Sequence, residues 1–175
     1  MAKDGESKGR PGLSGPPEFL AFSHVSVPCR DLEEGKRFYT RVLGGKVEIW
    51  APTTFAAFRI AGVDIGIGTE GCTFIAPATE YPHIAFFVGA KELAQMKEWL
   101  TSCKVPTSNY WTRRGVEALI FFRDPSGNLI ELYCERGFAA AEDLPHGPPR
   151  GHGVAIDVDA LRYTDWKLPE ERVLS

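Results

Sequence analysis

The sequence contains one order of elements twice, and this repeat restricts the chain to folds built from two similar halves. Each half begins with an alternating apolar stretch that carries a histidine, at residues 22–27 and 81–88. A helical pattern follows each stretch, and further strand patterns follow each helix. His24 and His83 occupy the matching place in the two halves, 59 residues apart. We therefore predict two tandem βαβββ modules.

Local signals mark the ends of these elements. Asp31, with Glu34 three residues later, forms a capping-box pattern that opens the first helix. Residues 124–128, Asp-Pro-Ser-Gly-Asn, predict a turn between strands at 116–122 and 128–134. The first module is predicted to contain three further strands, at residues 47–50, 54–60 and 63–67, and the second module a helix at about residues 91–103.

These elements predict an α+β fold, in which the mixed sheets of both modules form a curved, partly open barrel around a metal site. Module one is expected at residues 19–70 and module two at residues 78–136 of a paired domain, 19–136. Residues 1–18 are rich in Gly, Pro, Ser and charge, a composition typical of a flexible arm. Residues 137–175 fit neither module and predict an irregular tail.

Composition limits the partners. The net charge is −3, the pI is about 5.8, and the largest basic cluster is Arg113–Arg114, so neither nucleic acid nor an anionic membrane is an expected partner. No apolar run approaches the ~20 residues of a membrane span. The four cysteines form no C-x-x-C pair and no secretory signal is recognisable, so we predict a cytoplasmic protein with reduced thiols.

Alternation places three potential metal ligands on one side of the sheets. His24 and His83 point away from the Val, Ile and Phe side chains of their strands, and Glu131 lies opposite Ile130 and Leu132. Each of the three taken alone is more often an ordinary packed or surface residue. Together, two imidazoles and a carboxylate suit a divalent ion with open coordination positions. We therefore predict a metal site of His24, His83 and Glu131, and an enzyme.

Other side chains are expected to line a pocket for a small-molecule substrate. Phe87 and Phe121 would make it partly apolar, which suits an aromatic or alkyl substrate. Arg113 lies in a loop from which an arginine could hold a carboxylate or phosphonate. The predicted pocket residues are Ser26, Phe87, Arg113 and Phe121.

Three runs resemble the vicinal oxygen chelate superfamily, which includes glyoxalase I, extradiol dioxygenases, fosfomycin-modifying enzymes, methylmalonyl-CoA epimerase and bleomycin-binding proteins. The runs are HVSVPCRDLEEGKRFYTRVLG, HIAF and FFRDPSGNLIELY, and the resemblance covers about residues 19–135. The ending D-P-x-G-N-x-I-E-L is the most specific part. The resemblance implies metal ligands at His24, His83 and Glu131. It also implies a homodimer, in which sites can be built across the subunit boundary.

Two departures from the family pattern reduce the number of reactions that we expect this protein to catalyse. The fourth ligand of glyoxalase-type members would fall on Gly66, which has no side chain to ligate, and a shift of two residues would offer Asp64 instead. Extradiol dioxygenases carry a tyrosine and a histidine before the Asp-Pro turn. Phe121 stands at the tyrosine position, and Thr112–Arg114 fill the region of the histidine. Ordinary catechol cleavage by those two groups is therefore not expected.

The favoured function is a non-haem Fe(II) dioxygenase acting on a small oxygen-chelating substrate, with Mn(II), Zn(II) or Ni(II) as alternative metals. Tyr133 and the tail residue His152 are predicted to handle protons as catalytic residues, with His146 as a second tail candidate. One alternative is a metal-assisted lyase, isomerase or thiol transferase. Another is a metal-free drug-binding protein.

Overall fold

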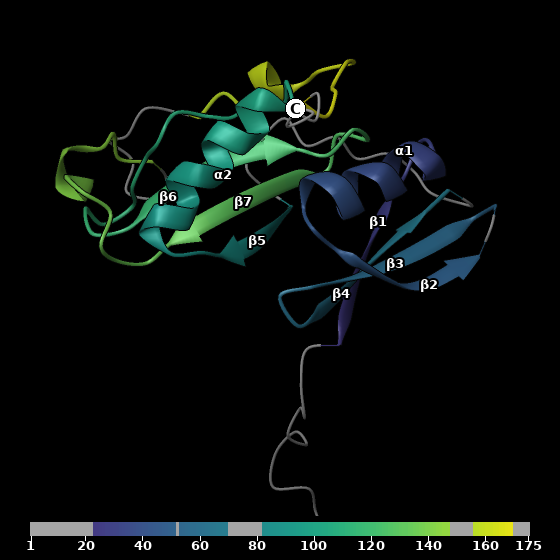
Figure 1. Cartoon of the computed structure of the whole chain (residues 1–175). Coiled ribbons are helices and arrows are strands. Elements are labelled where there is room, and N and C mark those ends of the chain that lie inside the picture. The colour runs from purple at the N-terminus through teal and green to yellow at the C-terminus, as the bar shows by residue number, and fades with distance from the viewer. Residues whose placement is uncertain (1–22, 52, 70–81, 148–155, 170–175) are drawn as a thin grey trace, which may run out of the picture.

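The computed structural model describes residues 23–51, 53–69, 82–147 and 156–169, and Figure 1 shows the elements in two halves. The first half contains β1 (His24–Pro28), α1 (Leu32–Arg37), a π-helical continuation (Phe38–Val42), β2 (Lys46–Ala51), β3 (Phe55–Ile60) and β4 (Val63–Gly68). The second half contains β5 (His83–Phe87), α2 (Ala90–Ser102), β6 (Ala118–Arg123) and β7 (Leu129–Cys134). The tail carries 3-10 helices at Ala141–Asp143 and Asp159–Leu161. The arm expected at residues 1–18 lies outside the described residues.

The strands form two mixed sheets. The first has the order β1-β4-β3-β2, with β1 parallel to β4, and the second has the order β5-β7-β6, with β5 parallel to β7. Figure 1 shows α1 and α2 on the same side of the sheets. The α+β fold with two tandem modules is therefore confirmed. Among the described residues no strand of one sheet pairs with a strand of the other, so the curved, partly open barrel around a metal site is not confirmed.

The strand register shows which positions correspond in the two modules. Ser26 pairs with Gly66 between β1 and β4, and Ala85 pairs with Glu131 between β5 and β7. Because Ser26 and Ala85 each lie two residues after the histidine of their strand, Gly66 occupies the place of Glu131. A Cβ at Gly66 would lie 2.7 Å from Ser26 Oγ and 2.8 Å from the ring of Phe55, so a side chain at this place would require Ser26 and Phe55 to move.

Each sheet buries the face that packs on its helix. The larger core contains Phe38 and Leu93 from the helical segments, and Ile65, Ile120 and Ile130 from the strands. The opposite face of the second sheet carries a smaller apolar cluster of Trp111, Leu119, Phe121, Leu129, Val158 and Leu161. The face that bears the predicted ligands is thus only partly covered, by the loop before β6 and by the tail.

An irregular segment takes the place of the first strand after α2. Thr107 bridges Phe122 and Trp111 bridges Leu119, as two isolated pairings with β6. The backbone N–H of Phe121 donates to Oγ of Ser108 at 2.9 Å, where a regular ladder would present a carbonyl. The second module therefore has three strands in its sheet where the repeat predicted four.

No helix in the described ranges combines the length and the apolar character that crossing a membrane requires.

The turn between β6 and β7 connects the two modules. The carboxylate of Asp124 accepts hydrogen bonds from the N–H groups of Ser126 and Asn128, from the Asn128 amide and from the hydroxyl of Tyr39, at 2.7–3.0 Å. The Asn128 amide also donates to the carbonyl of Pro28 at 2.9 Å. One buried carboxylate therefore organises the turn and attaches it to the helical segment and first strand of module one.

Replacing Asp124 by Ala removes the acceptor of four buried donor groups. We expect the free energy of unfolding to fall by about 3 to 5 kcal/mol, because each buried donor left without a partner costs about 1–3 kcal/mol. Urea unfolding followed by circular dichroism measures this change. Asp165→Ala, which alters an exposed carboxylate, is the control and should cost less than about 0.5 kcal/mol. Equal costs for the two variants would contradict the assigned role of the turn.

The stability of the fold should also depend on pH through Asp124. Burial raises the pKa of this carboxyl from 3.8 to about 6. The folded chain therefore holds the proton more tightly than the unfolded chain, and stability should decline as the pH rises from about 4 to about 6. The shift corresponds to about 3 kcal/mol. Urea unfolding of Asp124→Asn across this range should lack the decline, and an unchanged slope would show that other groups cause it.

Candidate metal centre

Two of the three predicted ligands come together on the second sheet. His83 begins β5, and Glu131 lies in the middle of β7, the central strand, on the face away from α2. Nε2 of His83 lies 3.5 Å from Oε2 of Glu131, whose side chain is 4% exposed. Two atoms that each bind one ion at about 2.0–2.2 Å lie about 3 to 3.5 Å apart. The pair therefore fits two ligands of a shared ion.

Aromatic packing orients the imidazole of His83. Phe121 is fully buried, and its ring meets the His83 ring edge-on with the centroids 5.3 Å apart. Trp111 stacks on the other side of Phe121 at 5.6 Å. Phe121, predicted as a pocket residue, thus acts here as the support of a candidate ligand.

The third predicted ligand lies on the other sheet. His24 is exposed, and its Nδ1 lies 3.0 Å from Oγ of the adjacent Ser23. Among the described residues, no group of three His, Cys, Asp or Glu side chains could hold a metal ion. A single chain therefore presents two candidate ligands together, and the complete trio stays a prediction.

Asp64 has a different partner. Its Oδ1 lies 2.6 Å from Nε of Arg59, and its Oδ2 accepts a hydrogen bond from the same guanidinium at 2.9 Å. Arg59 lies on β3 directly across from Asp64 on β4. This ion pair would have to open before Asp64 could serve as a fourth ligand.

Arg113 reaches the candidate centre from the loop before β6. Its Nη2 lies 3.2 Å from Oε2 of Glu131, and its guanidinium carbon lies 4.6 Å from the ring centroid of Trp111. A buried carboxylate needs a cation or several donors nearby. In the described structure His83 and Arg113 both approach Glu131, so a metal ion at this place would share the carboxylate with a guanidinium or displace it.

Glu117 holds this loop and was missed by the sequence analysis. It is 1% exposed, and its Oε1 accepts hydrogen bonds from the N–H groups of Arg113 and Arg114, each at 2.9 Å. Burial opposes ionisation of Glu117, but these bonds, its own N–H and the Arg114 guanidinium outweigh burial and lower its pKa. The available signal was a single carboxylate inside the apolar run of residues 116–122, directly after two arginines.

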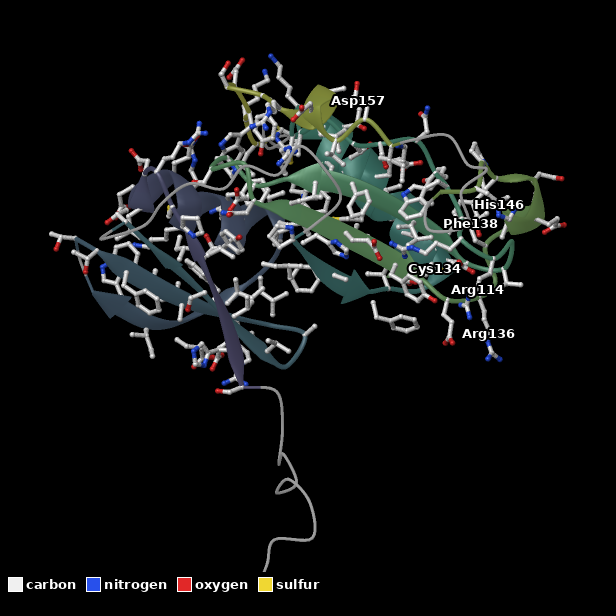
Figure 2. All side chains as sticks on the ribbon, turned by 180° about the vertical axis from the view of Figure 1, so that it is seen from behind. Arg114, Cys134, Arg136, Phe138, His146 and Asp157 are labelled. Carbon is white, nitrogen blue, oxygen red and sulfur yellow. The ribbon has the colours of Figure 1, made fainter. Side chains whose placement is uncertain are left out.

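The remaining predicted residues are distributed around this face. Arg114 donates to the hydroxyl of Tyr133 at 3.0 Å, and the ring of Phe87, which is 68% exposed, lies 6.1 Å from that of Tyr133. Figure 2 shows Arg114 and His146 at the same end of the molecule. His152 lies outside the described residues.

Comparison with known proteins supports a common fold. FosX, a fosfomycin resistance protein from Listeria monocytogenes, matches with a TM-score of 0.60 and 22% identity over 67% of this chain and 94% of that chain. A mutant of FosX in complex with Mn(II) and 1S,2S-dihydroxypropylphosphonic acid matches with a TM-score of 0.57 and 21% identity over 71% and 97%. Lactoylglutathione lyase from Agrobacterium tumefaciens matches with a TM-score of 0.56 and 20% identity over 68% and 95%. None of the curated protein sequences compared with the chain matches it significantly.

These solved structures establish similarity of fold, because their identities to the chain are low. The family assignment has a separate basis, which is a family model that matches residues 21–132. That range contains both modules and all three predicted metal ligands. The chain belongs to the Glyoxalase/Bleomycin resistance protein/Dioxygenase superfamily.

Proposed function

We propose that this protein is a metal-dependent enzyme that uses a divalent ion as a Lewis acid on a small, oxygen-chelating substrate. The ion would be held by His83 and Glu131 of one chain and by His24 of a second copy. The observation that carries the proposal is the 3.5 Å separation of the His83 and Glu131 ligand atoms on a partly covered sheet face. A divalent ion bound there polarises the substrate oxygens and stabilises negative charge that develops on them.

Both the geometry and the types of donor support a metal ion. Imidazole suits Zn(II), Fe(II) and Ni(II), and a carboxylate suits Mn(II). Phe121 packs against the imidazole, and the guanidinium of Arg113 contacts the carboxylate of Glu131. The Mn(II) found in a FosX structure makes Mn(II) the first ion to test and Fe(II) the second.

A second copy of the chain would complete the ligand set. His24 occupies in module one the strand position that His83 occupies in module two. It is exposed on its own sheet, and the large side chain of Phe87 is 68% exposed on the ligand face of the other sheet. If a twofold axis placed module one of each copy against module two of the other, it would cover these faces and form two equivalent sites.

Side chains of this chain would position the substrate and move its protons. Arg114 donates to the oxygen of Tyr133, which leaves the phenolic O–H free to donate to a substrate oxygen. Phe87 lies beside Tyr133 and would exclude water from the same region. In this role Tyr133 holds and delivers a proton at its Oη atom.

A Lewis-acid reaction is favoured over the dioxygenase reaction expected from the sequence. The structures compared above are described as fosfomycin resistance proteins and a lactoylglutathione lyase, not as oxygenases. Phe121 stands where extradiol dioxygenases carry a tyrosine, and it is buried against His83 with no group that can transfer a proton. Iron and oxidation are therefore not supported for this chain.

The shared site predicts that two defective variants can repair each other. His24→Ala and Glu131→Ala should each bind Mn(II) at least about tenfold more weakly than the wild type, because each loses one ligand. An equimolar mixture of the two, refolded together, should recover about a quarter of the wild-type sites, because half of the dimers formed at random are mixed and one of the two sites in a mixed dimer keeps all three ligands. Isothermal titration calorimetry with Mn(II) measures both results.

The matched control is Glu135→Ala, which removes an exposed carboxylate just beyond β7 and should leave Mn(II) affinity unchanged. Weak binding by His24→Ala that no mixing restores would place all ligands in one chain and contradict the shared site. A wild-type protein that takes up no Mn(II), Fe(II) or Zn(II) would contradict the proposed function itself.

The Lewis-acid assignment predicts no enzymatic consumption of oxygen. With catechol as the probe, protein reconstituted anaerobically with Fe(II) should take up no more oxygen after air is admitted than the same concentration of free Fe(II). Glu131→Ala provides the matched background, because it lacks a ligand. Oxygen uptake that requires the wild-type chain and disappears in this variant would restore the dioxygenase hypothesis.

A further inference from the structure

Two adjacent arginines converge on the face of β7 that points away from α2, beside the candidate metal centre. Nη2 of Arg113 lies 3.2 Å from Oε2 of Glu131, and Nη2 of Arg114 donates to the hydroxyl of Tyr133 at 3.0 Å. Glu131 and Tyr133 are two residues apart on one strand, so their side chains share a face. Both guanidinium groups therefore lie beside the place where a metal-bound substrate would sit.

The backbone of the loop fixes where these arginines start. The buried carboxylate of Glu117 accepts the N–H groups of both arginines, each at 2.9 Å. Oγ1 of Thr112 accepts the N–H of Gly115 at 2.9 Å, and Gly115 has a φ of 80°, a conformation that favours glycine. The turn is thus held by hydrogen bonds on both sides, and it directs both side chains toward β7.

Packing also restrains the side chain of Arg113. Its guanidinium lies over Trp111, with 4.6 Å between the guanidinium carbon and the ring centroid, and Trp111 is 3% exposed. A guanidinium stacked on a fixed ring loses little conformational freedom when it binds a ligand. Its planar fork also matches the oxygens of a carboxylate or phosphonate.

The charges around this face favour an anion once a metal is present. The guanidinium groups of Arg113 and Arg114 are balanced by the carboxylates of Glu117 and Glu131, both of which are buried. A divalent ion bound to Glu131 would add two positive charges that these carboxylates do not compensate. The site would then attract an anionic group, while a neutral chelating substrate would leave it positively charged.

We infer that the substrate carries an oxyanion group, a carboxylate or a phosphonate, next to the oxygens that chelate the metal, and that Arg113 and Arg114 bind this group. The inference rests on the proposed function and specifies its substrate class. When such a substrate binds, Arg113 exchanges Glu131 for the oxyanion as its partner, and Arg114 keeps its bond to Tyr133 while other N–H donors of its guanidinium bind the same group. Charge-assisted bonds of this kind give both strength and orientation.

The competing interpretation gives the arginines a structural role only, as counterions of Glu117 and Glu131. The two interpretations differ in what the arginines do for anions. Counterions that stabilise the fold would affect unfolding but not the preference between a charged and a neutral ligand. If the arginines bind substrate, replacing them should reduce the preference for the charged ligand and leave the affinity for the metal unchanged.

A matched pair of probes tests this difference. The Mn(II)-loaded protein is titrated anaerobically with 2,3-dihydroxybenzoate and with 2,3-dihydroxybenzamide, which share the chelating diol and differ in charge. We expect Arg113→Met and Arg114→Met each to reduce the preference for the benzoate by about tenfold or more relative to the wild type. Comparison among variants cancels the intrinsic affinity of each probe for the metal. Affinity for the benzamide and for Mn(II) should not fall.

Two further variants and one further probe complete the experiment. Arg136→Met removes an exposed arginine close to Arg114 (Figure 2) and should keep the wild-type preference, whereas Arg113→Lys should restore part of it. Displacement of the benzoate by methylphosphonate would assign the site to phosphonates as well as carboxylates, and its failure would restrict the site to carboxylates. An unchanged preference in Arg113→Met and Arg114→Met with Mn(II) bound would overturn the inference alone. Absence of Mn(II) uptake by the wild type would overturn the proposed function too.

Discussion

The buried carboxylate of Asp124 links the fold to the site. It accepts two backbone N–H groups of its own turn, and these bonds set the register in which β7 leaves that turn. The register decides which β7 side chains face α2 and which face outward, because a shift by one residue would turn Glu131 into the apolar core. The same carboxylate accepts the hydroxyl of Tyr39 and so attaches module one to the turn. The Asp-Pro-Ser-Gly-Asn motif is therefore architectural, although it lies next to a candidate ligand.

The two modules share a topology but have diverged at the positions that matter for chemistry. At the place equivalent to Glu131, module one has Gly66 covered by Phe55, and the nearby Asp64 is paired with Arg59. Module one can therefore offer only His24 at this face, whereas module two offers a histidine and a carboxylate together. Among the described residues no three ligands of one chain come together, and for this reason the proposed site takes its third ligand from module one of another copy. In the proposed site, the two modules would therefore contribute different ligands, His24 from module one and the His83–Glu131 pair from module two.

Local patterns in the sequence were sufficient for much of this architecture. The predicted helix start is observed as a hydrogen bond from the Glu34 N–H to the Asp31 carboxylate at 2.8 Å, whereas the Glu34 carboxylate accepts the indole N–H of Trp166 at 3.0 Å. Alternation correctly placed Glu131 and Ile130 on opposite faces of β7. Features that depend on packing between residues far apart in the chain could not be predicted from the sequence. The contact of Arg113 with Glu131 across 18 residues depends on how the loop before β6 folds. Alternation carries no information about such loops.

The contact between Arg113 and Glu131 gives metal binding and anion binding a common energetic basis. The negative charge of a buried carboxylate beside a guanidinium is already balanced by that cation. A metal ion therefore gains less binding free energy from Glu131 than it would from an unpaired carboxylate. The guanidinium of Arg113, still stacked on Trp111, would then have lost its contact with Glu131, while the backbone N–H of Arg113 stays bonded to Glu117. An oxyanion on the substrate would take the place of the Glu131 carboxylate beside Arg113 and would offset the free energy lost when that ion pair opens. By linkage, the metal and an anionic substrate would then each strengthen the binding of the other beyond the coupling that chelation alone gives a neutral substrate.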